Sequence, residues 1–254
     1  MFFDTHAHYD DGHFSGDREE LLAAMPGRGV ALILNPGCTV ESSRAAAALA
    51  ERFPHVYAAA GIHPEDCAGA GEAELSEIRR LCEREKVVAV GEIGLDYHWE
   101  DNPPKEEQQC IFRAQLELAL ELDLPVIVHD RDAHGDCFSI VSEYPGLRGV
   151  FHCFSGSAEL AAELLKRGWY LGFDGPVTYK NAKKVLAVLA ATPVNRILLE
   201  TDAPYLPPVP HRGERNDSAY LPLIAAAVAA AKGATVNEIA AASMENGKRL
   251  FHVP

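Results

Sequence analysis

Residues that bind metals recur at similar places along the sequence, each at or just after the end of a short apolar segment. Imidazole nitrogens suit Zn, Mn, Fe or Ni, whereas carboxylates can bridge two cations or hold harder ones. His6 and His8 stand two residues apart, so on an extended segment both side chains point to the same side and reach one metal. These residue types predict a site for one or two divalent cations. The candidate ligands are His6, His8, Glu92, His129, His152 and Asp202.

The elements that must position these ligands are eight short apolar segments separated by amphipathic stretches. In those stretches apolar residues recur at spacings of three and four, which is typical of helices with one buried face. The predicted strands are 2–4, 30–34, 56–61, 87–92, 125–129, 150–152, 169–173 and 196–200. The predicted helices are 18–25, 41–52, 72–85, 105–122, 159–167, 181–189, 220–232 and 236–251.

Alternation of eight strands with helices in 254 residues predicts an α/β fold, a (β/α)8 TIM-like barrel. An open doubly wound sheet is disfavoured because no G-x-G-x-x-G follows the first strand. No linker or composition break divides residues 1–254, which indicates one domain. The strands of such a barrel open on one face, so ligands between positions 6 and 202 would meet there. A single strand-end histidine is usually a hydrogen-bonded core residue; the joint placement is what favours a site.

Charge and composition limit the classes of partner. The net charge of −14 argues against a broad surface that tracks phosphates, although two cations would add four positive charges in one cleft. The N-terminal residues do not form a signal peptide, and the longest uncharged stretch, 218–231, is too short for a membrane span. We therefore expect a cytoplasmic protein with no membrane contact and no obligate protein partner. The cysteines form no C-x-x-C pair, which favours reduced packing residues, and Cys153 is expected to point away from its neighbour His152.

A second set of polar residues is predicted at the same face and suits an anionic substrate. Arg131 offers a planar fork for phosphate, and the turn at Ser155 offers backbone amides. The alternatives are that His63 is structural and that Arg131 pairs with a neighbouring aspartate. The tyrosines near the face could stack on a base or simply fill space under a loop. The candidate substrate contacts are His63, Arg131, Ser155 and Tyr205, with Tyr97 nearby.

Ordered motifs run along nearly the whole chain. They are Asp4-Thr5-His6-Ala7-His8, Gly61-Ile62-His63-Pro64, Gly91-Glu92-Ile93-Gly94-Leu95-Asp96-Tyr97, Val128-His129-Asp130-Arg131-Asp132-Ala133, Phe151-His152-Cys153-Phe154-Ser155-Gly156, Leu199-Glu200-Thr201-Asp202-Ala203-Pro204-Tyr205-Leu206, Arg212-Gly213, Arg215-Asn216 and Glu245-Asn246. With them the sequence resembles the TatD family of metal-dependent deoxyribonucleases, within the amidohydrolase-like barrels.

The resemblance implies hydrolysis of phosphodiester bonds in DNA or at short nucleic-acid ends, by an exonuclease that uses two divalent cations. It implies that His6, His8 and Asp202 hold one cation, that His129 and His152 hold the other, and that Glu92 bridges. Mg²⁺ is commonly invoked for the family, but it prefers oxygen ligands, so we expect Zn or Mn to bind these imidazoles more tightly.

The expected mechanism is in-line attack of a metal-activated water on the phosphodiester. Asp202 would accept the water proton while coordinating its metal, and Glu92 would hold both cations. His63 and Arg131 would neutralise charge on the phosphate as it develops. His63 could instead protonate the leaving group, and the sequence leaves these two roles open.

Some positions depart from the family pattern, and rival functions use the same ligands. Glu214, Ser218, His98 and Asp174 are unusual, and the acids among them put tight binding of long DNA in doubt because they repel phosphates. One rival is hydrolysis of an amide or an ester, including an aminoacyl-tRNA ester. Another is a metal-stabilised scaffold without activity, which predicts a coordinatively closed site. Fold alone does not decide among them.

Overall fold

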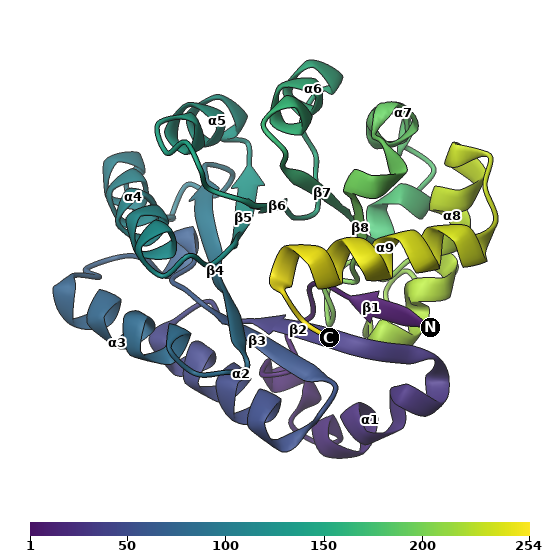
Figure 1. Cartoon of the computed structure of the whole chain (residues 1–254), viewed down its shortest axis with the longest axis horizontal. Coiled ribbons are helices and arrows are strands. Elements are labelled where there is room, and N and C mark those ends of the chain that lie inside the picture. The colour runs from purple at the N-terminus through teal and green to yellow at the C-terminus, as the bar shows by residue number, and fades with distance from the viewer.

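Eight parallel strands, each paired with its neighbour in sequence, form the centre of the structure, a computed structural model that describes residues 1–254 (Figure 1). Beyond their ends the first and last strands also meet: Thr5 N–H donates to the Leu199 carbonyl at 3.2 Å and His8 N–H donates to the Ala203 carbonyl at 2.7 Å. The sheet therefore closes, and the predicted (β/α)8 barrel is confirmed. The strands are β1 Phe2–Asp4, β2 Val30–Pro36, β3 Val56–Ala60, β4 Val87–Asp96, β5 Val126–Arg131, β6 Gly149–Phe151, β7 Tyr170–Phe173 and β8 Ile197–Leu199.

Helices surround the strands, as Figure 1 shows, and their buried faces pack on the outside of the barrel. Side-chain caps fix several helix starts: Thr39, Ser157 and Thr235 each accept a hydrogen bond from a backbone N–H in the first turn. The helices are α1 Arg18–Ala24, α2 Val40–Arg52, α3 Glu72–Cys82, α4 Lys105–Glu121, α5 His134–Ser142, α6 Ala158–Lys166, α7 Lys183–Ala191, α8 Leu221–Lys232 and α9 Val236–Phe251.

The last helix closes one end of the barrel. Leu250, Phe251 and Val253 lie in one cluster with inward-facing strand residues, and the ring of Phe251 meets that of Phe3 at 6.2 Å. Figure 1 shows α9 crossing the barrel close to β1. Because apolar side chains fill this end, polar ligands can gather only at the opposite end, where the carboxyl ends of the strands lie.

One predicted strand end is wrong, and one helix was not predicted. β4 does not end at Glu92 but continues to Asp96, with its register shifted against β5 between Val90 and Ile93. Gly94 makes this close pairing possible: its φ is +145°, and a Cβ there would lie 2.0 Å from the His129 carbonyl oxygen. The helix α5 was not predicted, because its glycine, serines and single valine and isoleucine give a weak helical pattern.

No single helix in the structure is long and apolar enough to cross a membrane; only α8 and α9 taken together, bent by 105°, reach the length and composition.

Candidate metal centre

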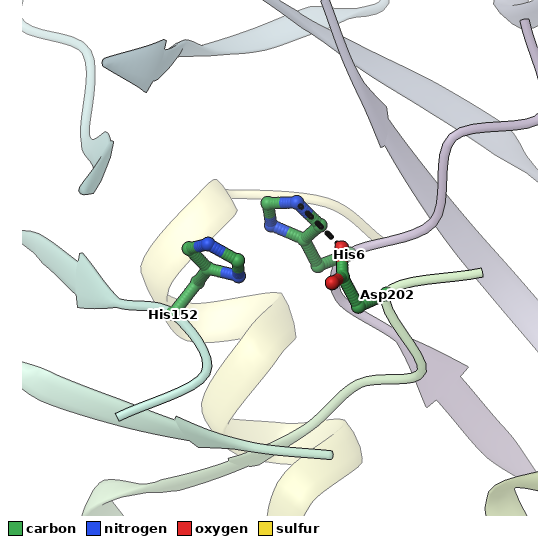
Figure 2. A group of neighbouring side chains, drawn as sticks. All are labelled: His6, His152 and Asp202. Atoms are coloured by element: carbon green, nitrogen blue, oxygen red, sulfur yellow. Dashed lines mark ion pairs between the residues drawn. The ribbon is translucent and has the colours of Figure 1, made fainter. Parts of the chain in front are cut away.

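All six predicted ligands lie at the carboxyl end of the barrel. His6 and His8 follow β1, His152 follows β6, and Asp202 follows β8, while His129 lies within β5. In Figure 2 the rings of His6 and His152 lie side by side, stacked at 4.0 Å, and Asp202 reaches toward His6. With Glu92 in β4, side chains from five strands distant in sequence thus converge on one small volume.

Glu92 occupies the middle of the group, and its two carboxylate oxygens face different histidines. Its Oε2 lies 3.1 Å from His6 Nε2 and 3.5 Å from His8 Nε2. Its Oε1 lies 2.9 Å from His129 Nδ1 and 2.8 Å from His152 Nε2. Each oxygen therefore has its own pair of imidazoles, which is the arrangement that a carboxylate shared by two cations requires.

Asp202 completes the group on the Oε2 side. Its Oδ1 lies 3.4 Å from His8 Nε2 and 3.7 Å from His6 Nε2. The Nε2 atoms of His6 and His8 are themselves only 3.0 Å apart. Lone pairs that converge so closely repel one another unless a proton or a cation lies between them.

The donor set fits divalent cations. Three overlapping triads have ligand atoms within 4.8 Å of one another: His6 with His8 and Glu92, His6 with His152 and Asp202, and His63 with Glu92 and His129. Nitrogen donors mixed with carboxylate oxygens suit Zn or Mn better than Mg, which prefers an all-oxygen shell.

Neighbouring acceptors orient two of the histidines. His8 Nδ1 lies 3.2 Å from the Pro36 carbonyl, and His129 Nε2 lies 3.0 Å from Asp96 Oδ2. An N–H that donates to each acceptor leaves the other ring nitrogen free to bind a metal, and the added charge of Asp96 makes His129 a stronger ligand. Asp96 ends β4, so the strand's extension beyond Glu92 supplies this orienting group.

The protonation states follow from burial and neighbouring charges. Burial, reinforced by repulsion from His152, lowers the pKa of His6 to about 4, so this ring is neutral at pH 7. Burial disfavours the charged form of His129, but Asp96 and Glu92 outweigh it and raise its pKa to about 10. Burial also opposes the charge on Glu92, yet the surrounding histidines hold its pKa well below the usual value. A cation at His129 would replace a proton that this ring otherwise keeps.

Two buried acids lie beneath the ligands. Burial and the charge of Asp202 raise the pKa of Asp174 to about 7, and burial and Asp174 raise that of Glu200 well above its usual value. Gly172 makes room for the carboxyl of Glu200, because a Cβ at position 172 would lie 2.2 Å from Glu200 Oε2. Glu200 Oε1 lies 3.7 Å from His152 Nδ1, so these acids border the centre without belonging to its inner set.

A cavity of about 830 Å³ opens over the centre and is lined by all four predicted substrate contacts. His63 Nε2 lies 3.6 Å from Glu92 Oε1, and its Nδ1 accepts a hydrogen bond from Glu65 N–H at 3.3 Å. With Nδ1 as the acceptor, Nε2, the nitrogen that faces the centre, is the one that carries an N–H. The predicted substrate contacts that line the cavity are His63, Arg131, Ser155 and Tyr205.

Arg131 is not paired with a neighbouring acid, contrary to one of the two interpretations of the sequence. Asp130 and Asp132 lie instead 2.8 Å from the imidazole nitrogens of His134 and His98. The Arg131 guanidinium rests against the ring of Trp99, 5.1 Å from its centroid. Its N–H groups remain available to a phosphate at the cavity wall.

The family assignment follows from comparison with known proteins. The sequence matches the family model described as TatD related DNase over residues 3–252. The chain belongs to this family. An uncharacterized metal-dependent hydrolase, YabD of Bacillus subtilis, is 44% identical over the full length of both chains. The 3'-5' ssDNA/RNA exonuclease TatD of Cronobacter sakazakii is 36% identical over 98% of this chain and 97% of that one.

The fold agrees with a solved structure of the same family. YjjV, a TatD homologue from Escherichia coli K12, superposes with a TM-score of 0.93 at 37% identity, over 100% of this chain and 98% of that one. The predicted TatD membership is therefore confirmed, and with it the interpretation of the chain as a metal-dependent hydrolase that acts on ester bonds.

Three features of this TatD-family site differ from the sequence prediction or were missed. Cys153 does not point away from the centre but lines the cavity, because β6 ends at Phe151 and the cysteine adopts a φ of 40°. Asp96 belongs to the motif at residues 91–97, but only its contact with His129 in the structure reveals its role. Trp99 gave no signal in the sequence, since a lone tryptophan after a strand is usually core.

Proposed function

We propose that this TatD-family protein is a two-metal phosphodiesterase that removes nucleotides from unpaired nucleic-acid ends, with one domain spanning residues 1–254. The observation that supports it best is the position of the Glu92 carboxylate between two pairs of histidines. Its Oε2 faces His6 and His8, while its Oε1 faces His129 and His152. A closed structural site would need none of the open volume above it. The cavity of about 830 Å³ leaves room for a substrate phosphate and its sugar.

The ligands divide into two halves joined by the bridge. One half comprises His6, His8 and Asp202 with Glu92 Oε2, and the other comprises His129 and His152 with Glu92 Oε1. Cations held there would lower the pKa of water, polarise a phosphoryl oxygen and stabilise the leaving oxygen. Zn and Mn fit the imidazole-rich set best, with Mg as the alternative that the activity assay must test.

The chain's own groups complete the reaction. Asp202 accepts the proton of the attacking water. Arg131 presents its free N–H groups to the phosphate as charge develops. His63, which carries its proton on Nε2, donates it toward the phosphate or the leaving oxygen. Ser155 and Tyr205, on the cavity wall, hold the rest of the nucleotide.

Short unpaired ends fit the charge distribution. Asp10, Asp11, Glu65 and Asp66 also line the cavity, and on an acidic chain they repel a long phosphate backbone. Attraction is confined to the cations and Arg131. The Cronobacter sakazakii relative is named a 3'-5' ssDNA/RNA exonuclease, which matches an end-binding site in preference to a duplex-tracking surface. We also propose a cytoplasmic location, because all six cysteines are free thiols.

The test starts from metal-free protein that is reconstituted separately with Mg, Mn or Zn. Single-stranded DNA, blunt duplex DNA, a dinucleotide phosphodiester and an aminoacyl ester are offered in parallel. We expect cleavage of single strands from one end and of the dinucleotide, with two cations bound per chain. Preferred cleavage of the ester would replace phosphodiester chemistry with acyl chemistry at the same centre.

Two variants separate substrate binding from metal binding. Arg131→Ala and His63→Ala should each keep two cations. Each should lower kcat/KM by an amount that corresponds to roughly 2–4 kcal/mol of lost transition-state stabilisation, similar to the loss of one hydrogen-bond donor from an oxyanion hole. Arg148→Ala is the control, because Arg148 precedes β6 at the opposite end of the barrel and pairs with Asp123. A loss of metal in Arg131→Ala would contradict its proposed role.

A further inference from the structure

The rim of the metal cavity carries an aromatic side chain that no step of the proposed reaction uses. Trp99 lies in the loop between β4 and α4, is 50% exposed and lines the cavity. Five large hydrophobic side chains are at least 40% exposed, and one of the others, Tyr205 at 47%, lines the same cavity. Exposed aromatic rings that gather at a polar cleft are typical of a surface that binds a ligand.

Trp99 stands beside the free guanidinium of the site. Arg131 lies against the indole, with its Cζ 5.1 Å from the ring centroid. A guanidinium stacked on an aromatic face is held in plane while its N–H edges stay available. The phosphate-binding fork therefore covers part of one face of the indole, the ring of His98 contacts it at 4.6 Å, and the half of Trp99 that stays exposed is left for a base next to the phosphate.

The loop that carries Trp99 is anchored to the metal centre. The side-chain amide of Asn102 donates to the Asp96 carbonyl and to Asp96 Oδ1, each at 3.1 Å, and Gln108 donates to the carbonyls of Asp96 and Pro103. The other oxygen of Asp96 orients His129. One carboxylate thus fixes both a metal ligand and the loop, so the backbone on either side of Trp99 is held in place before any ligand arrives.

The neighbours of Trp99 favour a base over a phosphate at this point. Glu100 and Asp101 are exposed acids directly after it, and they repel a phosphate backbone at the loop tip. Tyr205 lies on the other side of the centre, next to His8, with its hydroxyl donating to Asp11 at 2.7 Å. The two exposed rings therefore flank the metal ligands from opposite sides.

We propose that Trp99 is a nucleobase-stacking subsite, which takes one unpaired base of the nucleotide whose phosphate contacts Arg131. The proposal rests on the phosphodiesterase function above and adds its specificity. Stacking tolerates every base because each has a π-face, and it requires a base that is splayed out of a duplex. Trp99 thus selects single-stranded ends with little preference for sequence.

Binding can be tested without turnover. The chain has two tryptophans, and the other, Trp169, is buried against Phe151. Thymidine 5'-monophosphate should quench the fluorescence of the metal-loaded protein, whereas deoxyribose 5-phosphate, which lacks a base, should not. Trp99→Phe removes the reporting indole and should abolish the signal. Equal responses to the two ligands, or none to saturating thymidine monophosphate, would overturn the proposal.

Kinetics test the same subsite. Trp99→Ala should raise KM for a dinucleotide phosphodiester roughly 10- to 100-fold with kcat changed little, while Trp99→Phe keeps most of the affinity. An analogue with an abasic sugar in place of the stacked nucleotide should be cleaved equally well by Trp99→Ala, by Trp99→Phe and by the wild type. Leu120→Ala is the matched control, since it removes an exposed apolar side chain at the far end of α4.

Failure of the subsite and failure of the function give different results. If the wild type cleaves the dinucleotide and the abasic analogue alike and Trp99→Ala behaves identically, the stacking proposal is wrong while the function stands. If the wild type cleaves no phosphodiester yet thymidine monophosphate quenches Trp99, the nucleotide subsite stands and the reaction is of another class.

Discussion

Replacing Glu92 with glutamine separates a shared bridge from a carboxylate that serves one cation. The substitution keeps the volume of the side chain and one acceptor oxygen but removes its charge. Glu92 is only 3% exposed and lies within 3.6 Å of five imidazole nitrogens. Solvent therefore does not screen the loss of its negative charge. We expect the fold to persist and both halves of the metal centre to weaken together.

The magnitude follows from the burial of the carboxylate. Removing one partner of a buried ion pair costs roughly 3–5 kcal/mol, or about 10²- to 10⁴-fold in affinity. The half with His129 and His152 would keep only neutral ligands, whereas the half with His6 and His8 would keep Asp202, whose Oδ1 faces both of these rings. The loss of metal affinity should therefore be larger at the half with His129 and His152, and kcat/KM should fall by at least the same factor.

The assay is competitive metal titration against a chelator, combined with metal content by mass spectrometry and kcat/KM for a dinucleotide. Glu65→Gln is the control, because it removes one charge from the wall of the same cavity without touching a ligand. His129→Ala should weaken metal binding at one half alone. It shows the result expected for a ligand that serves only one cation. A Glu92→Gln protein that binds two cations normally, or that loses only one, would refute the bridge.

Three further outcomes are expected. Asp96→Asn should weaken metal binding at the His129 half by roughly 10- to 100-fold in the same titration, because an orienting charge is lost. Burial raises the pKa of Asp4 from 3.8 to about 6, so its contribution to stability is full below pH 4 and is lost as pH rises through 6. Asp4→Asn, which mimics the protonated acid, should then match the wild type near pH 4 and exceed its free energy of unfolding at pH 7 in urea titrations. Binding of single-stranded DNA should show a shallow slope of log K against log salt, and a slope equivalent to roughly six phosphate contacts would reveal a basic track.

The barrel was predictable because its signals are local and repeated. Each strand is an apolar run followed by an amphipathic helix, and a strand or helix end shifted by a few residues does not change the order of elements. The helix α5 escaped prediction because its residues have weak helix propensity, and packing of Cys137, Ile140 and Val141 decides its conformation. The length of β4 escaped because a glycine-containing strand that pairs closely with β5 looks like a strand end in sequence.

The inner part of the site was predictable for a different reason. Once eight strands are placed in order, barrel geometry alone brings their carboxyl ends together, and the residue types there identify a metal centre. The sequence could not reveal pairings between side chains of different loops. The stack of Arg131 on Trp99 and the contact of Asp96 with His129 join the β4 and β5 segments, and neither follows from spacing.

The charge of the molecule and the charge of its substrate conflict, and the site resolves the conflict over a short range. The chain carries −14, and seven of the 20 residues that line the cavity are acidic, yet Glu92 and Asp202 provide only two negative charges against the four that two cations would bring. With two cations bound, the centre would be positive within a few ångströms and surrounded by a negative surface, and salt screens that surface beyond roughly 8 Å at physiological ionic strength. Such a field favours one phosphate at the end of a strand and disfavours the next several. The proposed selectivity for ends would then follow from electrostatics, and the exposed rings of Trp99 and Tyr205 would supply the binding energy that charge cannot.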